Sequence, residues 1–395
     1  MMSPEGHKAD CHNKDPKVVH REQIDIFREK VRPLLEKYPR YDTDYSLLRW
    51  LHAYKFNYDM AAQQMEWSLN AMDAVGIFDK DLSSVESIHK EVRNITPVAE
   101  YFPGGMLGCD KDGNVINMHT VGKVRPRSLV DAERVSRFYI GAIMDCEGCN
   151  TLIRAEEAKR GRKLGSIMIV DLSDFSYDLI FQIPATKIYI NALLLIQTMF
   201  PDTARRLYVV NAPLVVNALI KMVLMALAKE TVAKIEILGS NWKDILVERH
   251  GAENLTRCCG GTLSDDLLRP GGDVPDSVKK GIRKEHYEAD QLKKVRVSAR
   301  DEICIPFEVE KEGSKLCWYF ECSSGDIDFS VVYQNHEVWP CFRISTEFVP
   351  EFGEIICKQS GTYEIRFSNK HAIFWSKEIK YIVQIESPTN THHTF

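Results

Sequence analysis

Few residue patterns in this chain could perform catalysis. The sequence CEGC at 146–149 has the spacing of a metal site or a redox pair, but the thiols at 258–259 are not a convincing second half. Asp171 and Asp174 follow an apolar run where parallel sheets bind ligands, although acidic residues also cap turns there. The GxSxG, GxxxxGK(S/T), GxGxxG and HExxH patterns of common enzymes do not occur. We therefore expect no catalytic residue, metal or cofactor, and we expect the thiols to be structural.

An apolar stretch is the most unusual feature of the sequence. Residues 214–228 contain only two polar side chains, Asn217 and Lys221. The stretch is shorter than the roughly 20 residues that a transmembrane helix needs. A helix that is apolar on nearly all sides is usually buried in a core. Alternatively, one face lines an apolar cavity and the other meets a membrane, with Asn217 and Lys221 forming a thin polar strip.

Composition and charge exclude several classes of protein. The 395 residues are 44% hydrophobic and 27% charged, which favours two or three globular domains. A net charge of −5 argues against general nucleic-acid binding. The first residues lack the apolar core of a signal peptide, so we expect a cytoplasmic protein with transient, peripheral membrane contact. Two basic clusters, 154–163 and 279–300, are interleaved with acids and are interpreted as solvated helix faces or, alternatively, anionic membrane contacts.

The hydrophobic pattern divides the chain into ordered regions flanked by tails. Apolar residues recur at spacings of three and four through 20–99, which predicts a small helical bundle with Thr43 among its capping candidates. Residues 100–265 alternate between strand-like and helical segments, which predicts a mainly parallel sheet covered by helices. Residues 266–386 are expected to form a linker and an antiparallel β-sandwich. We expect no structure in 1–19 or 387–395.

The individual elements follow from these patterns. The fold class is α/β with a C-terminal β-sandwich. The predicted strands of the sheet are 114–120, 165–172, 206–213 and 234–240. The predicted helices between them are 131–159, 184–199 and 214–228. The predicted strands of the sandwich are 302–310, 315–324, 326–334, 361–369 and 377–387.

Several of these segments resemble known families. The run FPDTARRLYVVNAPLVVNALIKMVLMALAKETVAKIEILGSNWKDIL, followed by ENLTRCCGGTL, is similar to the CRAL-TRIO lipid-binding domain of the yeast phosphatidylinositol/phosphatidylcholine transfer type. LLRWLHAYKFNYDMAAQQM resembles the helical N-terminal extension of that domain. CWYFECSSGDIDFSVVY and GTYEIRFSNKHAIFWSKEIKYIVQI resemble a GOLD (Golgi dynamics) domain, which implies a jelly-roll-like sandwich. Together these resemblances cover the chain from about residue 20 to residue 386.

The resemblance implies a gated lipid pocket. Members of the CRAL-TRIO family hold one lipid under a mobile gate helix, and the apolar stretch occupies the position of that helix. The implied gate residues are Leu214, Val215, Ala218, Leu219, Met222 and Met225. Members that bind phosphatidylinositol have head-group residues that match Lys55, Thr231 and Lys234 here. A glutamate of the family is replaced by Asp202, which is shorter but can still accept hydrogen bonds from inositol hydroxyls.

The match to the head-group pattern is incomplete. The arginines of the family are replaced by Tyr54 and Thr203, and its LPxxYGG segment has Thr256 for proline and Cys259 for the aromatic residue. The resemblance therefore implies a lipid carrier for phosphatidylinositol or a similar hydrophobic ligand, with a transient membrane surface and a possible protein partner of the GOLD domain. Two alternatives stay open, a carrier of tocopherol, retinoid or squalene, and a lipid-sensing signalling or trafficking scaffold.

Overall fold

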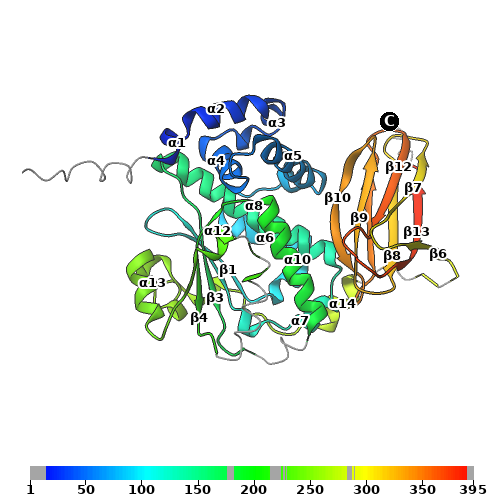
Figure 1. The fold of residues 1–395 in the computed structure, drawn as a ribbon. Helices are drawn as coiled ribbons and strands as arrows, with labels where there is room; N and C mark the ends of the chain where they lie inside the picture. Colours follow the sequence, from blue (N-terminus) through cyan, green and yellow to red (C-terminus); the bar gives the residue numbers. More distant parts are fainter. Residues whose placement is uncertain are drawn as a thin grey trace, which may run out of the picture.

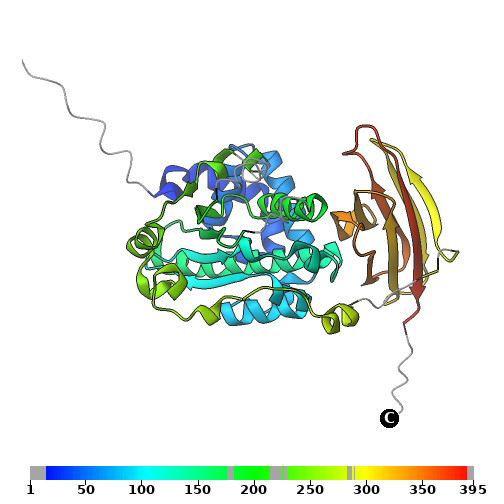
Figure 2. The same cartoon turned by 90° about the horizontal axis from the view of Figure 1, so that it is seen from below.

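The computed structural model describes residues 15–175, 182–213, 224–225, 227, 229–282, 287–288 and 290–388, except for the side chains of 280–282. It contains an N-terminal group of helices, an α/β part and a C-terminal β-sandwich, which lies beside the helices in both views (Figure 1; Figure 2). The predicted fold class is confirmed, with a mainly parallel sheet and two antiparallel sheets.

The predicted N-terminal bundle is present and follows its capping signals. Thr43 accepts a hydrogen bond from the backbone N–H of Ser46 and so begins α4. Gly76 follows α5 with a φ of 72°, a left-handed conformation that glycine adopts without strain. The helices of this part are α1 (Pro16–Val19), α2 (Arg21–Lys30), α3 (Arg32–Lys37), α4 (Asp44–Ala53), α5 (Tyr58–Ala74) and α6 (Val85–Ile95).

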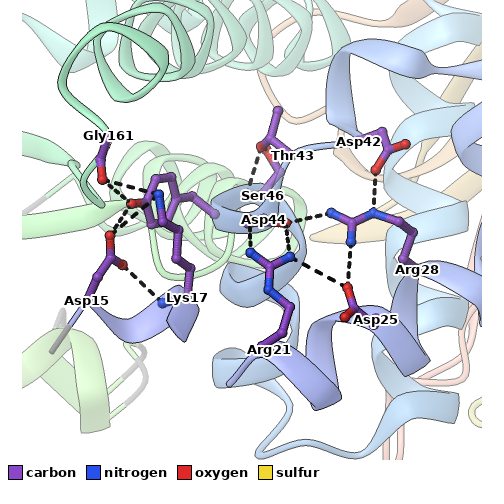
Figure 3. Close-up of polar contacts among 11 residues, drawn as sticks. Asp15, Lys17, Arg21, Asp25, Arg28, Asp42, Thr43, Asp44, Ser46 and Gly161 are labelled. Atoms are coloured by element: carbon purple, nitrogen blue, oxygen red, sulfur yellow. Dashed lines mark hydrogen bonds and ion pairs between the residues drawn. The ribbon is translucent and has the colours of Figure 1, made fainter. Parts of the chain in front are cut away.

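Residues 15–19 correct our expectation that the whole segment 1–19 lacks structure. Asp15 caps α1 by accepting a hydrogen bond from the backbone N–H of Lys17 at 3.0 Å. The hydroxyl of Tyr45 on α4 contacts Asp15 at 2.6 Å and the carbonyl of Gly161 at 2.7 Å. Figure 3 shows this network beside the ion pairs of Arg21 with Asp44. The short helix forms because distant polar groups hold it, which local sequence does not reveal.

Five strands form the central sheet, in the order β1-β2-β3-β4-β5. The first pair is antiparallel and the remaining pairs are parallel. All four predicted strands of this region occur, whereas β1 was not predicted because its sequence, GGMLGC, has few residues of strand propensity. The bounds are β1 (Gly104–Cys109), β2 (Val115–His119), β3 (Ser166–Asp171), β4 (Ala204–Val210) and β5 (Ile235–Ile237).

Helices cover the sheet as expected. Figure 1 shows α13 and α10 on opposite sides of it. The helix α6 packs closely on α8, since a Cβ at Gly148 would lie 2.7 Å from Ile88. The helices of this part and of the linker are α7 (Pro126–Val130), α8 (Val135–Arg160), α10 (Ile183–Met199), α12 (Lys229–Val232), α13 (Trp242–His250) and α14 (Asp276–Ile282).

The C-terminal sandwich contains two four-stranded antiparallel sheets, β10-β9-β12-β7 and β11-β8-β13-β6. Rings of Phe320, Phe329 and Phe367 meet between them, with centroids 4.7–5.5 Å apart. All five predicted strands occur, but β6, β10 and β11 were not predicted. The strand β10 includes Pro340 and shifts register twice against β9, which obscures its alternation. The bounds are β6 (Lys293–Val297), β7 (Glu302–Val309), β8 (Lys315–Cys322), β9 (Asp326–Tyr333), β10 (His336–Ser345), β11 (Glu351–Ile356), β12 (Gly361–Ser368) and β13 (Lys377–Glu386).

The sandwich is packed against the helices rather than merely tethered to them. The Tyr139 ring of α8 meets Phe342 at 5.8 Å between centroids, and its hydroxyl donates to the carbonyl of Arg343 at 2.9 Å. On β11, the carboxylate of Glu351 accepts a hydrogen bond from the Ser136 hydroxyl at 2.6 Å. The two parts therefore share a buried interface with a polar contact inside it.

This contact predicts a pH dependence of stability. Burial raises the pKa of the Glu351 carboxyl to about 7, although Arg134 and Ser136 oppose the rise. Because this value exceeds the ordinary 4.5, the folded state binds the proton of Glu351 more tightly, so the contribution of this carboxyl to stability is fully present below pH 4.5 and is lost as the pH rises through about 7. Ionisation of Glu351 is expected to lower the free energy of unfolding by about 3 kcal/mol.

Denaturant unfolding at pH 5 and pH 8 measures the effect. Glu351→Gln keeps an acceptor for Ser136 but cannot ionise, so its free energy of unfolding is expected to change less between the two pH values than that of the wild type. Equal changes in the two proteins would contradict the assignment to Glu351.

Candidate functional site

Three side chains with nitrogen donors converge on the carboxylate of Asp202, between α10 and β4. Lys234 Nζ lies 2.8 Å from Asp202 Oδ1, and His52 Nδ1 lies 3.2 Å from Oδ2. Lys163 Nζ also contacts Oδ2. Asp202 has a φ of 51°, which aspartate tolerates better than most residues. These side chains come from four separate parts of the chain and define what we call the Asp202 site.

The electrostatics of the Asp202 site favour an anionic ligand. Burial alone would raise the pKa of Asp202, but the hydrogen bonds from His52, Lys163 and Lys234 outweigh it and lower that pKa strongly. Burial lowers the pKa of Lys163, against the attraction of Asp202. Two lysines facing one carboxylate leave a net positive charge. The side chains are 19–30% exposed, so a phosphate can reach the donors from solvent.

The other two predicted head-group residues lie nearby but outside this cluster. Lys55 is 82% exposed and lies 3.7 Å from the carboxylate of Glu230. Thr231 is the next residue on α12, and its carbonyl accepts a hydrogen bond from the backbone N–H of Lys234. The turn after α4, which contains Lys55, therefore lies beside Glu230 on α12. Of the four predicted residues, Asp202 and Lys234 are the pair whose side chains are in contact in the described part of the chain.

Two residues of the Asp202 site were not predicted. His52 precedes Lys55 by three residues, but Lys55 lies beyond the end of α4 with a φ of 52°, so no helical spacing relates the two. Lys163 belongs to the basic cluster 154–163, which we interpreted as a solvated helix face or a membrane contact. That interpretation is wrong for Lys163, whose side chain is 19% exposed and contacts Asp202, and for Arg154, whose side chain is 11% exposed and pairs with Glu147 at 2.6 Å.

An apolar surface next to the Asp202 site is incompletely packed. On one face of the sheet, Ile167 and Tyr208 are buried against α13. On the other face, Val170, Leu207 and Ile235 are only partly buried, and Ile235 directly follows Lys234.

The helix α10 is also incompletely packed. It is rich in isoleucine and leucine, yet only Ala185, Ile188 and Met199 of its 17 residues are buried. Apolar side chains that remain half accessible are typical of the lining of a ligand pocket.

Most of the predicted gate lies outside the described residues. This applies to Leu214, Val215, Ala218, Leu219 and Met222. Met225 is described, and its side chain is 80% exposed. Among the helices that the structure describes, none combines the length and the apolar content needed to cross a bilayer.

The motifs that we did not expect to be catalytic make structural contacts. Asp171 accepts hydrogen bonds from the Ser173 backbone and from Asn211, and so ties the end of β3 to the end of β4. The two thiols of CEGC lie on α8, and burial raises the pKa of Cys149 to about 12. A thiol with so high a pKa is protonated at neutral pH, which makes it a poor metal ligand or nucleophile.

Comparison with known proteins finds a family match in the central part of the chain. Residues 99–261 match the CRAL/TRIO domain family. The matched range includes the whole central sheet, Asp202, Lys163 and Lys234, whereas His52 comes from the helices that precede it.

Several relatives extend beyond the CRAL/TRIO domain. A CRAL-TRIO domain-containing protein of Caenorhabditis elegans is 21% identical over 342 residues, which are 84% of this chain and 82% of that protein. Protein ctg-1 of the same organism is 22% identical over 386 residues, 91% of this chain and 97% of that protein. A phosphatidylinositol/phosphatidylcholine transfer protein of Arabidopsis thaliana is 23% identical over 240 residues, 60% of this chain and 40% of that protein. The crystal structure of Sfh5 covers 58% of this chain and 84% of its own, with 14% identity and a TM-score of 0.42.

Proposed function

We propose that this protein binds one lipid molecule and carries it between membranes. The phosphate of the head group would be bound at the Asp202 site, and the acyl chains would cover the half-buried apolar surface of α10 and the sheet. The observation that carries the proposal is the convergence of Lys163 and Lys234 on Asp202, beside partly buried Ile235. A charged site that adjoins an apolar lining matches the two halves of a phospholipid.

We propose phosphatidylinositol as the ligand. Its phosphate suits the lysines, and its ring hydroxyls can donate to Asp202. The Arabidopsis relative, named for phosphatidylinositol and phosphatidylcholine transfer, supports this choice. The order of domains also resembles the animal tocopherol-associated protein (supernatant protein factor), which supports a neutral ligand instead. Lipid extracted from the purified protein and identified by mass spectrometry distinguishes the two.

We further propose roles for the remaining parts. The stretch 214–228 would act as the gate, and the sandwich, as a GOLD domain, would recruit a membrane or a protein partner. The gate role predicts that Met225, which is 80% exposed, contacts the bilayer during exchange.

Transfer of labelled phosphatidylinositol between vesicles tests both the carrier and the gate. Met225→Asp is expected to slow transfer by about tenfold or more, because it removes an apolar contact worth about 1.5–3 kcal/mol and adds a charge. Met60→Asp on α5 is the matched control, since Met60 is also exposed, at 53%, and lies on the bundle. No transfer by the wild type would refute the carrier, and equal rates in all three proteins would refute the role of Met225.

A further inference from the structure

The turn between β12 and β13 presents three consecutive apolar side chains to solvent. Ile373, Phe374 and Trp375 are 60%, 81% and 79% exposed. Among the residues that the structure describes, no other phenylalanine or tryptophan is exposed to this extent. Aromatic side chains of this size normally contribute to a core, so their joint exposure at one turn indicates a surface that meets a partner.

The turn is held in a defined conformation by Asn369. The Asn369 side-chain amide donates to the carbonyl of Trp375 at 2.8 Å and to that of Ser298 at 3.2 Å. The side chain is fully buried, and its backbone N–H and C=O pair with Asp301 and Arg300. The apolar side chains are therefore displayed by a pre-organised turn, which reduces the entropy lost on binding.

A basic edge runs into the same turn. Lys293, Lys294 and Arg296 of the edge strand β6 are exposed, and Arg300 follows in the next turn. Arg296 donates to the Ser376 hydroxyl at 2.8 Å, which joins the strand to the apolar turn.

The charge of this edge is not neutralised. None of the four cations forms an ion pair with any residue that the structure describes. The exposed acids alongside are Asp290, Asp301 and Glu378, while Glu302 is paired with Lys370 at 3.0 Å. Four cations against three acids leave the edge positive.

The turn is also connected to the proposed lipid pocket. His371 contacts Asp326 at 3.2 Å, and Asp326 is paired with Lys187 of α10 at 3.1 Å. Anything that binds the turn therefore also lies close to the helix whose apolar side chains are half accessible.

We infer that residues 370–376 and the four cations, which we call the basic-aromatic edge, dock on an anionic lipid bilayer. Phe374 and Trp375 enter the interfacial layer, where aromatic rings are favoured, and the cations lie over the lipid phosphates. A protein groove would accept the rings, but unpaired cations beside a row of apolar side chains match the layered chemistry of a bilayer better. This inference deepens the proposed recruiting role of the sandwich and does not depend on which lipid the pocket holds.

Sedimentation of the full-length protein with phosphatidylcholine vesicles, with and without phosphatidylserine, tests the inference. The wild type is expected to bind the anionic vesicles, and more weakly as salt is raised. Phe374→Ser combined with Trp375→Ser is expected to bind at least about tenfold more weakly, because two apolar anchors are lost. Ile356→Ser, at a 57% exposed position elsewhere on the sandwich, serves as the control and should bind normally.

Trp375 also provides a spectroscopic readout. Vesicles should shift the tryptophan emission of the wild type to shorter wavelength, and Trp375→Phe should reduce that shift while retaining binding. The inference is overturned if the wild type ignores anionic vesicles, or if the double variant binds them as tightly, as expected for a protein-docking turn. Native mass spectrometry of the same proteins detects any lipid bound in the pocket and so separates the two proposals. Bound lipid without docking refutes only the basic-aromatic edge, and docking without bound lipid refutes only the lipid site.

Discussion

Replacing Lys163 and Lys234 by methionine and Asp202 by asparagine is expected to weaken phosphatidylinositol binding by at least about 100-fold, because two charge-assisted contacts to phosphate are lost at about 1.5–3 kcal/mol each. Asp202 must change with the lysines, since its carboxylate would otherwise be left partly buried without its cations. Methionine retains the apolar stem of lysine, so packing is preserved. Affinity is measured by titration with short-chain phosphatidylinositol.

Two controls identify the source of the loss. Binding of a neutral isoprenoid or of phosphatidylcholine, whose head group need not occupy the site, should be unchanged. Lys55→Met removes a lysine that is 82% exposed and is expected to have a much smaller effect, since an exposed ion pair contributes little. Undiminished phosphatidylinositol binding by the triple variant would show that the head group lies elsewhere and would favour the neutral ligands.

The fold could be predicted where the hydrophobic period was clear. The apolar runs within β2, β3 and β4 and the alternating strand β12 each carry their signal within a few residues. The strands β1 and β10 carry no such signal, since glycines interrupt the first and Pro340 the second. The helix α1 depends on Tyr45 and Gly161, which are far away in sequence.

The Asp202 site could be predicted only in part, for a related reason. Asp202 and Lys234 were inferred from a resemblance of motifs, and the structure places them in contact. His52 lies 150 residues from Asp202 in sequence, and Lys163 lies 39 residues away. No local pattern indicates that such residues meet. The contact of His52 depends on how the N-terminal helices pack on α8, and that of Lys163 depends on the pairing of β3 with β4.

A buried ion pair fixes that packing. Arg49 on α4 pairs with Glu157 on α8 at 2.6 Å, and their side chains are 6% and 3% exposed. Arg49 also donates to the carbonyl of Leu164, whose backbone N–H donates to Glu157. Leu164 follows Lys163, and Arg49 precedes His52 by one turn, so the pair positions both residues of the Asp202 site that were not predicted.

Arg49→Ala is accordingly expected to lower the free energy of unfolding by about 3–5 kcal/mol, because Glu157 is left buried without its cation. Arg49→Met combined with Glu157→Met should recover most of that loss, since apolar residues of similar volume can replace a buried pair. Lys159→Ala, which removes an exposed pairing with Glu156 on the same helix, should change little. Denaturant unfolding measures all three variants. If the double variant is no more stable than Arg49→Ala, the loss of stability comes from packing and from the Leu164 contacts rather than from the uncompensated carboxylate. If the double variant recovers stability but binds phosphatidylinositol poorly, the ion pair is shown to position His52 and Lys163.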